Sequence, residues 1–329
     1  MQNTRQTNMI ITNCAACAAP LAHNAPRCVK CKTRYCDSTC QHDHWRRGHK
    51  QICKKIHRGG NAEQYHAAEK CKEAIAVAVE ACAEDTKGQT CYICTEAVHW
   101  KTREGIVRGC ACRGTAGFAH VSCLAEQAKI LIAEAEEDNL AWTVKSERWS
   151  RWHKCSLCEQ NYHGVVQCGL GWACWKTNLG RPEEHWARDS AMMALGHGLS
   201  AARRWEEALT THQANLAICK RHSAPDTRCL DIDSNIATCY ALLGRGEESL
   251  ALQRSIYARS SVMRPLDRIG VANNLAEALG RARHYAEAKN MLRKTIPEAQ
   301  MELGDDHRVT LTVRCGYASS IIESIMQGL

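Results

Sequence analysis

The sequence predicts two small zinc-stabilised α+β modules followed by an all-α array of helical repeats. Fourteen of the 22 cysteines fall, with two histidines, in two closely spaced strings that end at residue 158. Residues beyond about 190 lack this spacing and repeat small and apolar positions at intervals near 40. A chain of 329 residues is long enough for two or three domains. We therefore expect a zinc module at 14–53, a helical linker at 54–88, a second zinc module at 89–163, a connecting joint at 164–190 and repeats at 191–329.

The first string has the pairwise spacing of ligands for two tetrahedral zinc ions. Its members are Cys14, Cys17, Cys28, Cys31, Cys36, Cys40, His49 and Cys53. His42 and His44 are alternatives for the seventh position, although His49 and Cys53 are four residues apart and would share one helix face. Only five large apolar residues lie in this segment, too few to offset the conformational entropy of ordering it. Folding of the module is therefore expected to depend on metal.

The order of these ligands, and the run from Tyr35 to Cys53, resemble the MYND finger. The resemblance implies that Cys14, Cys17, Cys36 and Cys40 share one zinc and that Cys28, Cys31, His49 and Cys53 share the other. It also implies a surface that binds short proline-containing peptide motifs, with contacts from Gln41 and Trp45. Packing in the core is the alternative role for Trp45.

A segment rich in Ala, Glu and Lys separates the two strings. After Gly59 and Gly60 it predicts one helix from Ala62 to Ala83 that carries no chemistry. The second string then places eight further ligands in four pairs, the second of which is a short C-x-C. Its members are Cys91, Cys94, Cys110, Cys112, His120, Cys123, Cys155 and Cys158. Two more zinc ions would use all of them, which makes four in the chain.

The short pair, its following Arg113-Gly-Thr and Phe118 resemble the RING-CH finger. The resemblance implies a cross-brace in which Cys91, Cys94, His120 and Cys123 share one zinc and Cys110, Cys112, Cys155 and Cys158 share the other. A PHD finger, which places its histidine likewise, is the alternative. Each ion would have four protein ligands and no position for a reactive water. These zinc ions are therefore expected to be structural, and no catalytic residue is predicted.

RING-CH fingers generally act as ubiquitin ligases, which hold a charged ubiquitin-conjugating enzyme beside a substrate. The resemblance implies that Ile93, between the first two ligands, contacts that enzyme; packing is its alternative role. The sequence departs from the family at Gln127, where a tryptophan is usual, and at Glu159, where a cation is usual.

The C-terminal half repeats a two-helix pattern. Small residues recur at Gly196, Ala237, Ala276 and Ala318, and acidic-small pairs follow the first three of them at 207–208, 248–249 and 287–288. This pattern and the run from Leu303 to His307 resemble tetratricopeptide repeats in the longer form found in kinesin light chains. The resemblance implies paired helices that bury a continuous core by stacking.

Composition excludes several classes of protein. The formal charge of +8 counts every thiol as neutral; fourteen thiolates subtract fourteen charges and four Zn²⁺ ions restore eight, which leaves +2. Few aromatic residues accompany the basic ones near the N-terminus, so a nucleic-acid groove is not expected. No secretory signal and no apolar run of about 18 residues is present, which argues against disulfides and a membrane span. We expect a soluble protein of the cytosol or nucleus.

These features together favour a RING-CH-type ubiquitin ligase that selects its substrates through the MYND finger and the repeats. A non-catalytic adaptor with the same modules is the alternative. The expected partners are a ubiquitin-conjugating enzyme and short peptide motifs, and no small-molecule substrate is predicted. A methyltransferase is discounted because the asparagine-histidine-serine-cysteine core motif of SET enzymes is absent.

Overall fold

The computed structural model describes residues 13–19, 21–22 and 24–326. The chain divides into two compact units, Met1–Ala214 and Asn215–Leu329. Helices dominate both units, and the β structure of the described residues consists of isolated bridges in the two zinc modules. Of the helices in these ranges, none combines the length and apolar character needed to cross a bilayer.

The first finger consists of two loops and a bent helical arm. The arm comprises α1 (Ser38–His44), a wide turn (Trp45–His49) and α2 (Lys50–Arg58). Asp37 starts α1 because its carboxylate accepts a hydrogen bond from the Cys40 N–H at 2.8 Å. Gly48 bends the arm with a φ of 124°, a backbone conformation that favours glycine. The bend directly precedes His49 and Cys53, the last two residues of the first ligand string.

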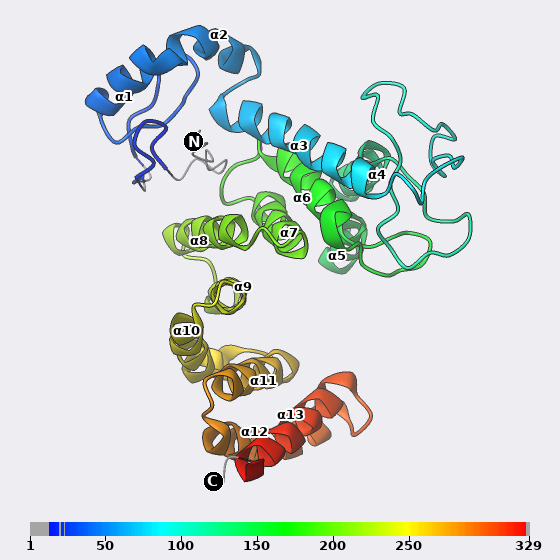
Figure 1. Ribbon diagram of the computed structural model, residues 1–329, viewed down its shortest axis with the longest axis vertical. Helices are drawn as coiled ribbons and strands as arrows, with labels where there is room; N and C mark the ends of the chain where they lie inside the picture. The colour runs from blue at the N-terminus through cyan, green and yellow to red at the C-terminus, as the bar shows by residue number, and fades with distance from the viewer. Residues whose placement is uncertain (1–12, 20, 23, 327–329) are drawn as a thin grey trace. The chain divides into compact units, whose positions relative to one another are not determined.

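Three helices form the interior of the first unit: α3 (Ala62–Ala81), α6 (Gly164–Asn178) and α7 (Trp186–Ala201). Figure 1 shows α3 beside α6, and α6 packs against both of the other helices. Trp172 and Trp175 of α6 are fully buried. The segments predicted as a linker and a joint therefore include core helices.

Glycines allow α6 and α7 to approach closely. A Cβ on Gly171 would lie 2.9 Å from the carbonyl oxygen of Ala194, and a Cβ on Gly198 would lie 2.7 Å from that of Gln167. Both contacts are with backbone atoms of the facing helix, which cannot move aside as a flexible side chain can. The glycines of this region thus serve helix contact, and the helical form of the joint was not foreseen from its glycine content.

The second finger surrounds α4 (Val121–Glu137), followed by α5 (Trp142–Trp149) and a short turn (Ser150–Trp152). Antiparallel bridges join Val98 to Gly105, Val107 to Ala119 and Lys154 to Asn161. α4 begins at Val121, directly after His120 of the second ligand string. Phe118 is buried, with the Arg108 guanidinium 4.4 Å from its ring centroid.

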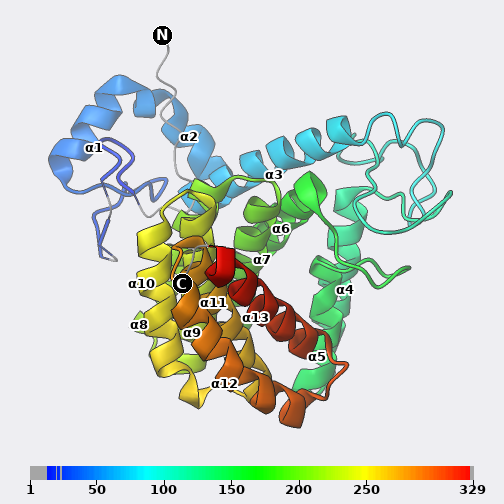
Figure 2. The ribbon, with the colours of Figure 1, turned by 60° about the horizontal axis from the view of Figure 1, so that its bottom comes forward.

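The repeats consist of paired helices. They are α8 (Trp205–Arg221), which runs across the unit boundary, α9 (Asp226–Leu242), α10 (Gly246–Arg259) with a short turn (Ser260–Val262), α11 (Pro265–Arg281), α12 (Tyr285–Leu303) and α13 (Arg308–Met326). In the second unit α9 packs on α10 and α11 on α12, and Figure 2 shows α13 lying along α12. The predicted all-helical, tetratricopeptide-like array after a cysteine-rich zinc-binding region is therefore confirmed.

The small positions of the repeat are buried with one exception. Ala237 and Ala276 are buried, and the Ser249 hydroxyl of α10 donates to the Ala237 carbonyl at 2.8 Å. Ala318, the fourth small position, is exposed on α13.

Candidate metal centres

Within the described residues, sixteen Cys and His donors gather in four groups. In each group the donor atoms all lie within 4.8 Å of one another. The groups are Cys14, Cys17, Cys36 and Cys40; Cys28, Cys31, His49 and Cys53; Cys91, Cys94, His120 and Cys123; and Cys110, Cys112, Cys155 and Cys158. These are the four sets that the two family resemblances imply. Each set takes one pair from each of two separate parts of the chain.

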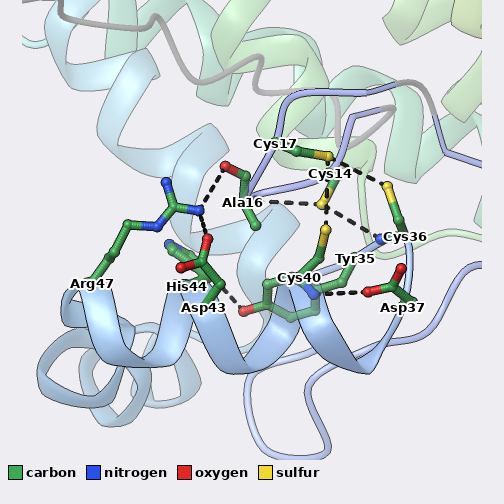
Figure 3. A network of polar contacts seen from close by, with 10 residues as sticks. All are labelled: Cys14, Ala16, Cys17, Tyr35, Cys36, Asp37, Cys40, Asp43, His44 and Arg47. Atoms are coloured by element: carbon green, nitrogen blue, oxygen red, sulfur yellow. Dashed lines mark hydrogen bonds and ion pairs between the residues drawn. The ribbon is translucent and has the colours of Figure 1, made fainter.

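The first group has the spacing of a tetrahedral sulfur site. The Cys17 sulfur lies 3.5 Å from that of Cys36 and 3.8 Å from that of Cys40. Two sulfurs bound to one zinc at about 2.3 Å are ~3.8 Å apart, whereas disulfide sulfurs are about 2.05 Å apart. Figure 3 shows the sulfurs facing one another at the start of α1. The group therefore fits a shared metal and excludes disulfide bonds.

The second group is fully buried and settles the choice among the histidines by position. The His49 Nε2 lies 3.3 Å from the Cys31 sulfur, and the Cys28 and Cys53 sulfurs are 3.8 Å apart. His44 instead stacks on the His49 ring at 4.8 Å between centroids, and its Nδ1 is 3.0 Å from the Tyr35 hydroxyl. His44 thus supports the ring of His49 from outside the group.

The third and fourth groups are arranged in the same way in the second finger. His120 turns its Nδ1 toward Cys94 at 3.3 Å and Cys123 at 3.6 Å, and the Cys112 and Cys155 sulfurs are 3.7 Å apart. Gly117 lies against the fourth group with a φ of 83°, and a Cβ there would be 2.6 Å from the Cβ of Cys112. Glycine is therefore required at this position for both backbone and steric reasons.

Backbone N–H groups donate hydrogen bonds that stabilise the thiolate form of some of these cysteines. Burial raises the pKa of the Cys14 thiol, but hydrogen bonds from the backbone N–H groups of Cys17, Ala16 and Cys36 outweigh it and lower that pKa to about 6. The Cys91 sulfur likewise accepts from the Ile93 N–H at 3.4 Å, and the Cys155 sulfur from the Leu157 N–H at 3.4 Å. The loops between paired cysteines are therefore shaped to hold thiolates.

Amides alone do not stabilise a full set of thiolates. Burial and the neighbouring Cys14 and Cys17 sulfurs raise the pKa of Cys40 to about 12. Four negative sulfurs at these separations repel one another, and a divalent cation at their centre removes the repulsion. Cysteine and histidine donors at tetrahedral spacing match the ligand preference of Zn²⁺. The MYND finger and these clusters together indicate zinc binding.

The burial of His49 affects how the stability of the first finger changes at low pH. Burial, with the nearby His44 and His66, lowers the pKa of His49 to about 4, against about 6.5 in an unfolded chain. Between these values the unfolded chain holds a proton that the folded finger does not. The stability that the neutral His49 ring contributes is therefore fully present above pH 6.5 and is lost as the pH drops toward 4, where protons also compete with metal for this ligand.

Thermal unfolding of the first finger between pH 7 and pH 4, followed by circular dichroism at constant ionic strength, checks this expectation. His57→Gln changes an exposed histidine of the same helical arm and should leave the pH profile as it is. A melting temperature that stays constant from pH 6.5 to pH 4 would contradict the assignment of this proton to His49.

The predicted contact residues are all accessible. Trp45 is 40% exposed, and its ring meets the ring of His49 edge-on at 5.9 Å, so it is not a core residue. Gln41 is half-buried on the preceding turn. Ile93 is 38% exposed, in the loop between Cys91 and Cys94.

One accessible apolar residue was missed from the sequence. Leu157 lies between Cys155 and Cys158 and is 51% exposed. The Tyr92 hydroxyl is 3.0 Å from the Ser156 hydroxyl, which joins the first and last ligand loops of the second finger. Ile93 and Leu157 each follow one of these bonded residues. The sequence signal that could have identified Leu157 is the presence of an apolar residue inside a C-x2-C pair.

Two known families match parts of the chain. The MYND finger matches residues 14–53 and the tetratricopeptide repeat matches residues 269–308. Ubiquitin carboxyl-terminal hydrolase 17 of Arabidopsis thaliana is 43% identical over 56 residues, or 17% of this chain and 7% of the relative. Ubiquitin C-terminal hydrolase 15 of Oryza sativa subsp. japonica is 49% identical over 43 residues, or 13% and 4%. The chain thus spans a small fraction of these relatives, within the region of the first finger.

Two solved structures resemble the chain in arrangement. The crystal structure of a Podosopora anserina kinesin light chain with nearly identical TPR-like repeats has a TM-score of 0.42 and 16% sequence identity. The match covers 64% of this chain and 90% of that chain. A variant of the same repeats matches to the same extent.

Proposed function

We propose that this zinc-binding protein-interaction protein is a ubiquitin ligase whose second finger resembles the RING-CH type and holds a ubiquitin-conjugating enzyme. In this proposal the sixteen Cys and His residues of the four groups bind four structural zinc ions. The first finger and the repeats bind segments of the substrate. The modules follow the predicted ranges 14–53, 89–163 and 191–329, joined by 54–88 and 164–190.

The observation that carries the proposal is the apolar surface on the two joined ligand loops of the second finger. Ile93 and Leu157 are 38% and 51% exposed, although each lies in a loop that begins at a buried cysteine. Side chains in such tight loops have little freedom, so they present an apolar contact at a low entropic cost. The Tyr92–Ser156 contact at 3.0 Å holds the two loops together.

The donor sets support a ligase mechanism in which the second finger positions the conjugating enzyme and its zinc ions take no part in the chemistry. Each group provides four protein donors, the number that closes a tetrahedral zinc site. A closed site cannot activate water. Acceleration would come from holding the thioester of the conjugating enzyme near a substrate lysine.

Loss of Ile93 is expected to abolish chain formation. Purified protein with activating enzyme, a panel of conjugating enzymes and ubiquitin should form ubiquitin chains, and Ile93→Ala should lower the rate at least about ten-fold, the usual effect of truncating a central apolar contact. Leu157→Ala should act in the same direction. Val98→Ala removes an exposed apolar side chain of the same finger away from the ligand loops and serves as the control.

A non-catalytic adaptor is the second candidate. The two matched families, the MYND finger and the tetratricopeptide repeat, are both interaction modules and favour it. The same assay separates the two candidates. If no conjugating enzyme of a broad panel supports ubiquitin chain formation while the zinc content is intact, the result favours the adaptor.

The first finger is expected to bind proline-containing peptides through Trp45. A fluorescein-labelled peptide, Ala-Ala-Pro-Ala-Ala, is a suitable probe, since an exposed tryptophan face packs well on proline. Trp45→Ala should weaken its binding at least about ten-fold in fluorescence anisotropy. Trp100→Ala, which removes a 71% exposed tryptophan of the second finger, should leave the affinity unchanged. Equal affinity for both variants would assign Trp45 to packing on His49.

A further inference from the structure

A small polar pocket lies between α9, α10 and α11 in the second unit. Its volume is about 190 Å³, and its polar lining comprises Thr238, Ser249, Gln253, Asn274, Glu277 and Arg281. Gln253 is 4% exposed, yet within the described part of the chain its side-chain oxygen accepts no hydrogen bond. A buried acceptor without a donor is costly, and such exceptions in folded proteins call for an explanation.

The two hydroxyl groups of the pocket also present acceptors. The Thr238 hydroxyl donates to the Ser234 carbonyl at 2.9 Å, and the Ser249 hydroxyl donates to the Ala237 carbonyl at 2.8 Å. Each hydroxyl proton is thus used inside a helix or between helices, and the oxygen lone pairs stay available. The pocket therefore complements a group with several N–H donors.

The charge balance favours a neutral donor. The Glu277 carboxylate is already paired with the Arg281 guanidinium of the same helix. An ammonium ion entering the pocket would lose its hydration without gaining an unpaired carboxylate, which is unfavourable. A primary amide has two N–H donors and no net charge, and its oxygen can accept from the neighbouring Asn274 or Arg281.

A second cavity of about 600 Å³ is a neighbour of the pocket. It shares Glu277 and Arg281 with the pocket and continues along α11 and α13, past Asn273, Thr312 and Ser319. A ligand that fills both cavities is longer than one side chain. The polar side chains along the second cavity suit an extended peptide backbone.

We infer that this pocket binds the primary amide side chain of an asparagine or glutamine in an extended peptide segment lying along α11 and α13. The inference rests on the proposed function, in which the repeats select substrate segments, and names the side chain that they select. Gln253 accepts a hydrogen bond from one N–H of the incoming amide, and the Thr238 or Ser249 hydroxyl oxygen accepts from the other.

Acetylated pentapeptides with a C-terminal N-methylamide, Ala-Ala-Xaa-Ala-Ala, test this with Xaa as Gln, Asn, Lys, Glu or Leu, since only the Gln and Asn peptides then carry a primary amide. Titration of the full-length, zinc-loaded, ¹⁵N-labelled protein by NMR should shift signals of Gln253, Thr238 and Ser249 with the Gln and Asn peptides. The Lys, Glu and Leu peptides should bind at least ten-fold more weakly. A preference for Lys, or no response to any peptide, would overturn the inference.

Gln253→Leu provides an independent check. If the side-chain oxygen serves a ligand, this substitution removes an unsatisfied acceptor, so the melting temperature of the second unit should stay the same or rise while the Gln peptide binds at least ten-fold more weakly. A lower melting temperature would instead show that Gln253 is a structural residue. Asn274→Ala, at an exposed position, should weaken binding of the Gln peptide without changing the melting temperature of the second unit.

These outcomes are distinguishable from failure of the proposed function. Ubiquitin chain formation and binding of the proline peptide to the first finger do not depend on this pocket. Both can succeed when the amide preference fails, and the amide preference can hold in a protein that proves to be an adaptor.

Discussion

Chelation of zinc is expected to unfold both fingers and leave the helices of Asn215–Leu329 folded. Structural zinc contributes on the order of 10–16 kcal/mol per site in small fingers, which exceeds the usual stability of a whole domain. The second unit contains none of the four donor groups. Trypsin digestion after treatment with a high-affinity chelator should therefore cut residues 14–158 rapidly and preserve a fragment from the repeats.

Native mass spectrometry completes this test by counting the ions. Four zinc ions per chain are expected before chelation. Cys31→Ser, within the second group, should lower the count by one and expose the first finger to trypsin. Cys71→Ala, at a buried cysteine of α3 outside the groups, should keep all four ions. Protease resistance of residues 14–158 after complete removal of metal would contradict the role assigned to zinc.

Gly198→Ala is expected to destabilise the first unit by about 2–3 kcal/mol, although alanine is the better helix former. The added Cβ would lie 2.7 Å from the Gln167 carbonyl oxygen and 3.0 Å from the Cα of Cys168. Both atoms belong to the backbone of α6, so the two helices would have to separate and lose buried contacts. Differential scanning calorimetry of the holo protein measures the change.

Gly270→Ala is the matched control for this substitution. Gly270 also lies inside a helix, α11, but a Cβ there meets no atom within 4 Å. Removing glycine from an open helical site should stabilise the second unit by about 0.5–1 kcal/mol. Opposite signs for the two substitutions are therefore expected. A stabilising Gly198→Ala would contradict the close packing of α6 on α7.

The ligand strings show what spacing can predict. Cysteines two to four residues apart can turn their sulfurs toward one ion because the intervening loop is too short to separate them. The grouping of distant pairs, such as Cys14 and Cys17 with Cys36 and Cys40, came from family resemblance, and spacing alone did not decide it. The structure brings the same pairs together, and for His49 and Cys53 the bend at Gly48 directs the chain toward Cys28 and Cys31.

The α6 segment shows where sequence patterns fail. Its glycines and tryptophans predicted a packed joint between modules and did not specify a helix, since glycine lowers helix propensity. In the fold they are the contact positions of a core helix, at Gly171 against Ala194 and through the buried Trp172. The energy gained by close packing of two helices outweighs a propensity loss of about 1 kcal/mol per glycine, and only the facing helix reveals it.

The sequence by itself determined the cysteine-rich zinc-binding region, the helical repeats and the donor residues, because ligand spacing and helical periodicity are local properties of the chain. The tertiary structure alone decided which apolar side chains stay exposed beside the ligands, as Ile93 and Leu157 do, and which buried acceptor is left unpaired, as at Gln253. Exposure and hydrogen-bond satisfaction depend on neighbours that are distant in sequence, so no local pattern encodes them.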